Sequence, residues 1–152
     1  MQPNKNFLPG TIKTIRGACA SIPHSADNRI IINFTDINGT LESDFNKKLV
    51  KRWIKVNNDF RGWYRGQTNF KLGKILSISV QTDTEVMCML VLNDGQLDLD
   101  ALKDAMISAG RYALADKKNI HINKSDVECP TIEKMLNEYF VKSGVNVSIY
   151  EA

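Results

Sequence analysis

Two polar loops, each placed ahead of a predicted helix, contain the residues best suited to hold a phosphate group. The first loop offers Asn33, Asn38, Gly39 and Thr40. The second loop offers Asn123, Lys124, Ser125 and Asp126. Unpaired N–H groups at the start of a helix bind anions, so the two loops together predict an anion site. Each loop is equally explained as a capped turn, because phosphate loops usually carry several glycines and because a carboxylate such as Asp126 caps helices.

The two histidines, His24 and His121, have no nucleophile or carboxylate at a recognisable spacing. A surface or structural role is therefore the simpler interpretation of each, since geometry makes a general base. His121 stays a catalytic candidate because it directly precedes the second loop. The sequence contains no nucleophile elbow, zinc-protease helix or Walker loop, so the standard hydrolase motifs are absent.

Basic and aromatic residues alternate between Lys47 and Arg65, a composition that single-stranded nucleic acid can use through stacking and phosphate contacts. Helical spacing places Trp53 on a buried stripe with Leu49, which favours a solvated basic face instead. A nucleic-acid partner is therefore disfavoured.

The composition is typical of one globular domain of 152 residues, with 43% hydrophobic residues and a net charge of +3. The three cysteines are far apart and predict neither disulfides nor a zinc site. No cofactor and no metal are predicted. No signal peptide or membrane span is recognisable, so we expect no membrane partner and a cytoplasmic protein.

Hydrophobic periodicity predicts an α/β protein, a three-layer α/β/α sandwich around a mixed, mostly parallel sheet. The predicted strands are 12–16, 30–32, 73–80, 85–92, 119–123 and 145–149. The predicted helices are 43–57, 97–115 and one that begins at Pro130 and ends at Gly144, and residues 60–70 are predicted to form a long packed loop. Ligands of such sheets bind beyond the carboxyl ends of the strands, where both polar loops fall.

Three segments carry a family resemblance that spans residues 12–150. They are "IKTIRGA" at 12–18, "NGTLESDFNKKLVKRW" at 38–53 and "TIEKMLNEYFVKSGVNVSIY" at 131–150. In this order they resemble the first strand, the phosphate loop with its helix, and the last helix and strand of the macrodomain family. The resemblance is greatest to its small branch of terminal ADP-ribose glycohydrolases and of yeast and phage ADP-ribose phosphatases. It implies a macrodomain-like fold over the whole chain, with a core of about residues 12–150.

The sequence departs from the family at several site positions. Ala18 stands where the family has the aspartate that contacts adenine, and Leu92 or Asn93 where the glycohydrolase branch has its catalytic lysine. The resemblance therefore implies no lysyl adduct. Residues 123–125 replace the family's Gly-x-Gly loop, and Asp126 corresponds to its catalytic aspartate.

The resemblance implies that the chain binds ADP-ribose or a related nucleotide, as a sequestering protein, with the diphosphate between the two loops. Lys124 would balance phosphate charge, and Tyr150 would pack on the adenine or its ribose. An alternative is an enzyme in which Asp126 or His121 helps water to remove a terminal phosphate or an ADP-ribosyl ester. A third hypothesis is a degenerate domain that binds a protein or nucleic acid through residues 47–65. The sequence does not indicate the natural ligand or the oligomeric state.

Overall fold

A single β-sheet runs through the computed structural model, which describes residues 8–21 and 27–151. Its strands are β1 (Ile12–Arg16), β2 (Arg29–Asp36), β3 (Ile75–Gln81), β4 (Thr84–Asn93), β5 (Gln96–Leu97), β6 (Asn119–Asn123) and β7 (Val147–Glu151). Its helices are α1 (Asp44–Arg52), α2 (Ile54–Gly66), α3 (Leu99–Ala115) and α4 (Pro130–Tyr139). Short 3₁₀ turns occur at η1 (Cys19–Ser21), η2 (Lys124–Asp126) and η3 (Val141–Ser143).

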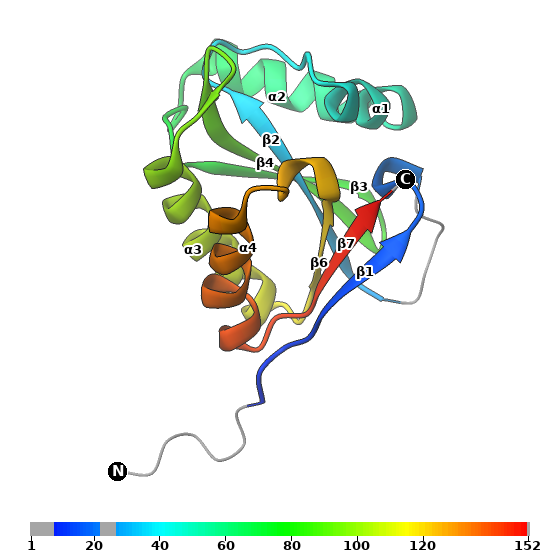
Figure 1. Ribbon diagram of the computed structural model, residues 1–152. Coiled ribbons are helices and arrows are strands. Elements are labelled where there is room, and N and C mark those ends of the chain that lie inside the picture. Colours follow the sequence, from blue (N-terminus) through cyan, green and yellow to red (C-terminus); the bar gives the residue numbers. More distant parts are fainter. Residues whose placement is uncertain (1–7, 22–26, 152) are drawn as a thin grey trace.

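The strand order is β1-β7-β6-β2-β4-β3, with β5 paired to β4. The β1–β7, β7–β6, β6–β2 and β2–β4 pairs are parallel, and β3 and β5 run antiparallel to β4. Helices cover both faces of the sheet, which gives three layers (Figure 1). The predicted α/β sandwich with a mixed, mostly parallel sheet is therefore confirmed.

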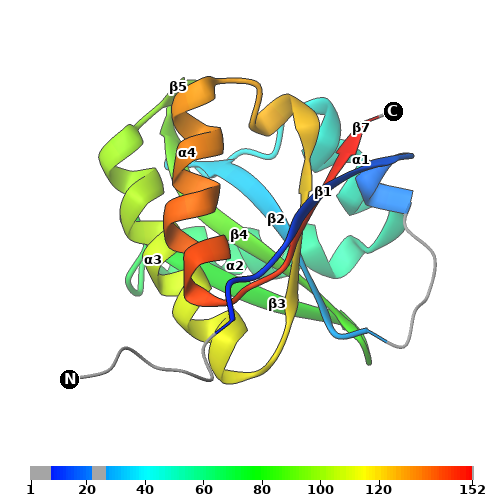
Figure 2. The same cartoon turned by 60° about the horizontal axis from the view of Figure 1, so that its bottom comes forward.

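The two faces of the sheet bury separate hydrophobic clusters. Ile30 and Ile32 of β2 face α3 and α4, whereas Ile31 faces α1 and α2. Every residue of β2 is buried, as a continuously apolar strand covered on both faces should be. Figure 2 shows α3 and α4 side by side on one face of the sheet. The carboxyl ends of β2 and β6 therefore lead into loops on the edge where the sequence predicts a site.

The segment predicted as one helix followed by a long loop folds as two helices. Trp53 closes α1 and opens α2, and α2 continues to Gly66, so the predicted loop 60–70 is wrong over its first seven residues. Val56 and Phe60 are fully buried at helical spacing and hold α2 against β3. Gly62 and Gly66 hide this period, because both lower helix propensity. Trp53 is only partly buried, and the Arg52 guanidinium lies 4.1 Å from its ring centre.

A close approach fixes α3 against the end of α4. A Cβ added at Gly110 of α3 would lie 2.6 Å from the carbonyl oxygen of Tyr139. Gly110 is buried, and Phe140 packs beside it at the end of α4. The absence of a side chain at position 110 therefore sets the distance between these two helices.

Candidate functional site

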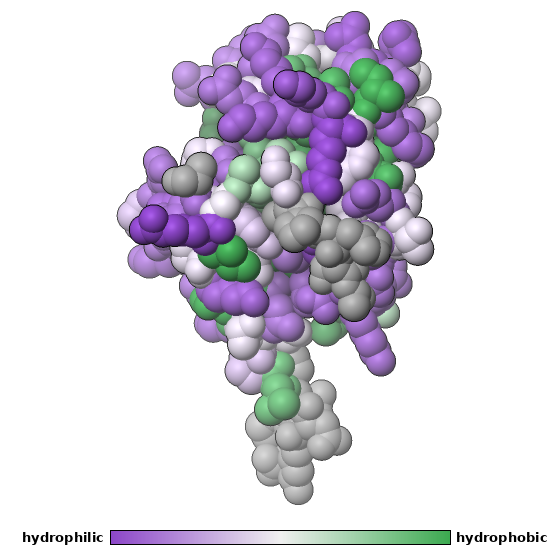
Figure 3. Space-filling view, turned by 90° about the vertical axis from the view of Figure 1, so that its right-hand side faces the viewer, coloured by the Kyte–Doolittle hydropathy of each residue, from purple (hydrophilic) through white to green (hydrophobic). Residues whose placement is uncertain are grey.

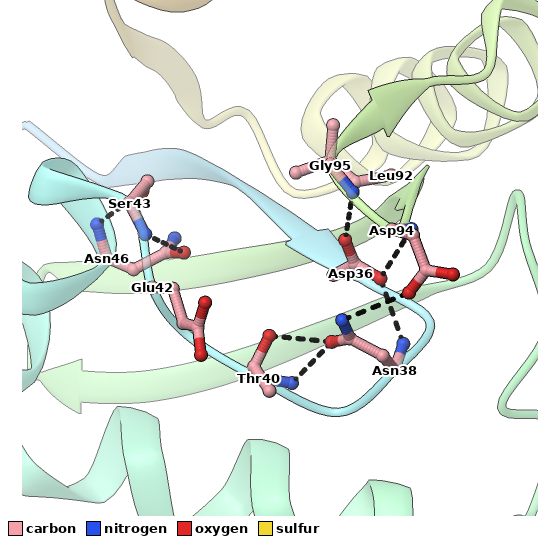
Figure 4. A pocket seen from close by; sticks show the side chains of 9 residues that line it. All are labelled: Asp36, Asn38, Thr40, Glu42, Ser43, Asn46, Leu92, Asp94 and Gly95. Carbon is pink, nitrogen blue, oxygen red and sulfur yellow. Dashed lines mark hydrogen bonds between the residues drawn. The ribbon is translucent and has the colours of Figure 1, made fainter.

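The loop between β2 and α1 is tied to the turn after β4 by one carboxylate. Asp36 Oδ1 accepts hydrogen bonds from the amides of Asn38 (2.9 Å) and Asp94 (3.2 Å). Asp36 Oδ2 accepts one from the amide of Gly95 at 2.7 Å. Asp36 is 7% exposed, so these three donors replace most of its water (Figure 4). An internal anion thus already uses amides of this loop that an anionic ligand could use.

Side chains satisfy further amides of the same loop. Asn38 Oδ1 accepts from the Thr40 amide at 3.0 Å, and Ser43 and Asn46 form a reciprocal capping box at the start of α1. The amides of Leu41 and Glu42 have no acceptor among residues 8–21 and 27–151. The predicted anion site on this loop is therefore reduced to a few donors next to the N-terminus of α1.

Helix α2 packs against the loop between β2 and α1 at Gly39. Gly39 has φ of +84°, a region that favours glycine, and a Cβ there would lie 2.5 Å from the Tyr64 ring. The Arg61 guanidinium donates to the Gly39 carbonyl at 3.3 Å. The sequence-based prediction missed both supports because it placed this part of α2 in a loop. A helix predicted over residues 56–64 would have placed Arg61 and Tyr64 on one face of that helix.

An open cavity of about 540 Å³ lies above this loop, and we call it the acidic cavity. It is lined by Asp36, Asn38, Thr40, Glu42, Ser43, Asn46, Leu92, Asp94 and Gly95 (Figure 4). Three of these side chains are carboxylic acids and none is a cation. Carboxylates accept hydrogen bonds from hydroxyl groups and repel phosphates. The lining therefore suits a ligand part that is rich in hydroxyls.

A second cavity of about 370 Å³ lies on the other side of the α1 N-terminus, and we call it the Asp126 cavity. Its lining is Ala18, Cys19, Ala20, Ser43, Asp44, Phe45, Lys48, Asn123, Ser125 and Asp126. It brings together the predicted residues Ala18, Asn123, Ser125 and Asp126. Ser43 lines both cavities, so they adjoin at the start of α1.

Asp126 is the least satisfied carboxyl group of this region. Its Oδ2 is buried and has no hydrogen-bond partner among the described residues. Burial raises the pKa of Asp126 from its ordinary value of 3.8 to about 7. A carboxyl group with such a pKa exchanges a proton near neutral pH, which is the property of a general acid or base.

Other predicted residues lie elsewhere. Lys124 pairs with Glu151 at 3.6 Å, and it does not line the Asp126 cavity. Asn33 is fully buried beneath the first loop, where Asn46 donates to its side-chain oxygen. His24 lies outside the described residues.

His121 and Tyr150 line a third cavity, apart from the two loops. Burial, followed by the nearby Arg29 charge, lowers the pKa of His121 to about 4. The two catalytic candidates, His121 and Asp126, therefore line different cavities.

The aromatic residues of the basic segment are used within the fold. Trp63 packs edge-on against Phe70 with ring centres 5.0 Å apart, and Tyr64 does so at 5.4 Å. Both residues are partly buried, whereas the lysines of α1 and α2 are exposed and form a basic face.

The described residues offer neither a metal-binding cluster nor a membrane-spanning helix. Nowhere in 8–21 and 27–151 do three His, Cys, Asp or Glu side chains gather in a way that could hold a metal ion. No helix in those ranges has the length and apolarity to cross a membrane.

Comparison with known proteins places the fold. The structure superimposes on a macrodomain protein from Streptomyces coelicolor with a TM-score of 0.85 and 19% identity, over 93% of this chain and 99% of that one. The macrodomain of Thermus aquaticus DarG gives a TM-score of 0.75 with 12% identity, over 94% and 99% of the two chains. Thermosipho africanus DarTG, solved in complex with ADP-ribose, gives 0.66 with 8% identity, over 82% of this chain and 38% of that one. No family model and no curated protein sequence matches the chain.

Proposed function

Because the chain has the macrodomain fold, we propose that it binds ADP-ribose or a related ADP-ribosyl nucleotide along the carboxyl edge of its sheet. The observation that carries this proposal is the pair of adjoining cavities that share Ser43 at the α1 N-terminus. Together the two cavities offer an apolar wall, the N-terminus of α1 and a group of carboxylates. The complex of the Thermosipho africanus protein with ADP-ribose supports this class of ligand.

The chemistry of the lining suggests how the ligand lies. Ala18, Ala20 and Phe45 give the Asp126 cavity an apolar wall that suits a base. The start of α1 between the cavities favours phosphate oxygens. The carboxylates and the Asn38 amide of the acidic cavity suit the hydroxyls of the distal ribose.

Charge limits the affinity of this arrangement. Glu42 and Asp44 lie along the phosphate path, and Lys48 is the cation that lines the Asp126 cavity. We therefore expect binding to depend on Lys48 and to weaken as salt concentration rises.

Titration calorimetry with ADP-ribose tests the proposal. We expect Ala18→Trp to abolish binding by filling the Asp126 cavity, whereas Leu114→Trp, on the exposed side of α3, leaves it unchanged. Lys48→Gln should weaken binding about fivefold, with Lys47→Gln as the matched control because Lys47 does not line the cavity. The proposal is wrong if millimolar ADP-ribose gives no heat, or if Ala18→Trp binds as well as the wild type. RNA binding that survives Ala18→Trp would support the basic-face hypothesis instead.

The partnerless carboxyl oxygen of Asp126 favours hydrolysis as a second candidate function. Its pKa near 7 suits the transfer of a proton to or from water at a phosphate or an ADP-ribosyl ester. This function requires the opposite orientation of the ligand, with the distal ribose and its scissile group in the Asp126 cavity and the base in the acidic cavity. We expect turnover of ADP-ribose 1″-phosphate that Asp126→Asn removes while ADP-ribose binding persists. His121→Gln should keep turnover, because His121 lies in another cavity. Equal turnover by Asp126→Asn and the wild type would exclude this role.

A further inference from the structure

A polar cavity of about 500 Å³ lies on the β1, β7 and β6 part of the sheet face that also carries α1 and α2. Here α1 packs on β2 and α2 on β3, while η1 packs on β6 and β7. We call this the sheet-face cavity. Figure 3, which looks at the side where β1 and β7 lie, shows a mostly hydrophilic surface with small, separate hydrophobic patches.

Strand register places three side chains of this cavity in one row. Lys13 of β1 pairs with Ser148 of β7, which pairs with His121 of β6. Residues at paired positions point to the same face, and adjacent strands lie about 4.8 Å apart. All three side chains line the cavity. A ligand that touches Ser148 is therefore within reach of both neighbours.

The free polar atoms of this row are donors. His121 is 7% exposed, and its Nε2 has no partner among the described residues. Its Nδ1 lies 2.8 Å from the Tyr150 hydroxyl. Burial raises the pKa of Tyr150, so its hydroxyl stays protonated and either donates to Nδ1 or accepts from it, depending on the His121 tautomer. In the tautomer in which Tyr150 donates, the ring proton of His121 sits on the buried Nε2 of a side chain that lines the cavity.

Two cations and one carboxylate line the cavity around this row, namely Lys13 of β1, Arg29 of β2 and Asp27. Lys13 on β1 and Arg29 on β2 both lower the pKa of His121, whereas Asp27 raises it. Arg29 pairs with Asp83 at 3.6 Å, and Lys13 has no carboxylate partner among the described residues. The lining therefore offers an anion the Lys13 ammonium group and neutral polar side chains, against the repulsion of the Asp27 carboxylate.

We propose that the row Lys13, Ser148 and His121 binds a compact oxyanion, a phosphate or a carboxylate, at a site separate from the nucleotide cavities. The ammonium group of Lys13 supplies the opposite charge. The Ser148 hydroxyl and His121 Nε2–H supply directed hydrogen bonds, and the Asn119 and Asn146 amides border the site. A bound oxyanion satisfies the buried nitrogen that the fold otherwise leaves without a partner.

Side-chain nitrogen NMR of His121 during titration with inorganic phosphate, and separately with succinate, tests the site. We expect a saturable shift of Nε2, and the anion that binds more tightly identifies the oxyanion class. Lys13→Gln and Ser148→Ala should each weaken binding about tenfold. Lys48→Gln, in the Asp126 cavity, should not affect it. Thermal melts check that each variant folds.

Two results would overturn this inference. One is the absence of any His121 shift with either anion, and the other is an unchanged shift in both Lys13→Gln and Ser148→Ala. Because the readout is local to His121, the inference fails or holds independently of ADP-ribose binding in the other cavities.

Discussion

The two loops at the carboxyl edge of the sheet treat their carboxylates in opposite ways. In the loop between β2 and α1, Asp36 accepts three backbone hydrogen bonds. In the loop between β6 and α4, the Asp126 Oδ2 is buried and has no hydrogen-bond partner within the part of the chain that the structure describes. A satisfied carboxylate stabilises a fold, whereas an unsatisfied one costs stability and is typical of a functional site. The first loop is therefore held rigid by its carboxylate, whereas the second loop contains a carboxyl group that the fold does not satisfy within the described residues.

Replacement of Asp36 should cause the largest change in the free energy of unfolding. Asp36→Ala leaves the amides of Asn38, Asp94 and Gly95 without their acceptor, and we expect a loss of about 3 kcal/mol in the free energy of unfolding. Urea denaturation measures it. Asp94→Asn is the matched control in the same cavity and should cost under about 1 kcal/mol, since Asp94 makes one long side-chain contact with Asn38 and asparagine tolerates its φ of +49°. Equal losses in the two variants would show that the three hydrogen bonds of Asp36 do not stabilise the first loop.

A methyl group at Gly39 should have the next largest effect. Gly39→Ala must overcome both a positive φ and the Tyr64 ring, so we expect a loss of about 2 kcal/mol in thermal or urea unfolding. Gly62→Ala in α2, where a Cβ meets nothing within 4 Å, should instead be neutral or stabilise by up to about 1 kcal/mol. If Tyr64→Ala fails to relieve any of the Gly39→Ala loss, the ring contact is not a cause of it.

Replacement of Asp126 should change the free energy of unfolding in the opposite direction to replacement of Asp36. With a pKa raised to about 7, the folded chain holds this proton more tightly than the unfolded chain, so stability falls as the pH rises from about 4 to about 7. We expect Asp126→Asn to flatten this slope and to stabilise the fold by about 2 kcal/mol at about pH 8. Urea unfolding over a pH series measures the slope. Glu128→Gln, exposed in the same loop, is the control, and a variant slope equal to that of the wild type would refute the buried-acid explanation.

The smallest effect on stability should come from Cys129, at the start of α4. The nearby backbone amides of Thr131 and Ile132 lower the pKa of its thiol, whereas burial raises the pKa of Cys19 and Cys88 to about 12. We expect iodoacetamide to modify Cys129 alone in the folded protein and to change the free energy of unfolding by less than about 0.5 kcal/mol. Mass spectrometry of labelled peptides locates the adduct, with Cys129→Ser as the blank. Labelling of Cys19 at a similar rate would show that the Asp126 cavity, which Cys19 lines, opens in solution.

Much of the sheet was predictable because its strands have simple patterns. The continuous run of Ile30, Ile31 and Ile32 predicted a central strand, and all three are fully buried. The α4 stripe was equally clear, since Ile132 and Leu136 are buried at a spacing of four. The boundary between α1 and α2 was not predictable from spacing, because the apolar period passes through Trp53 without a glycine or proline to mark the break.

The candidate site was predictable only in its parts. Its second loop was found from residue types, and the structure collects Asn123, Ser125 and Asp126 in one cavity. The role of Asp36 depends on the turn 58 residues later, a distance that local patterns do not reveal. His121 was grouped with Asp126 because the two are neighbours in sequence. His121 lies in the middle of β6 and faces the sheet-face cavity, whereas Asp126 lies in the turn η2 after the end of that strand.

Gly110 of α3 affects the position of the second loop, although it lies in another element. The position of α4 follows from how closely α3 lets it approach, and the segment that carries Asp126 leads directly into α4. A larger residue at position 110 would push α4 outward and shift the segment that carries Asp126 without touching it. Residue 110 therefore constrains the geometry of the Asp126 cavity although it does not line that cavity.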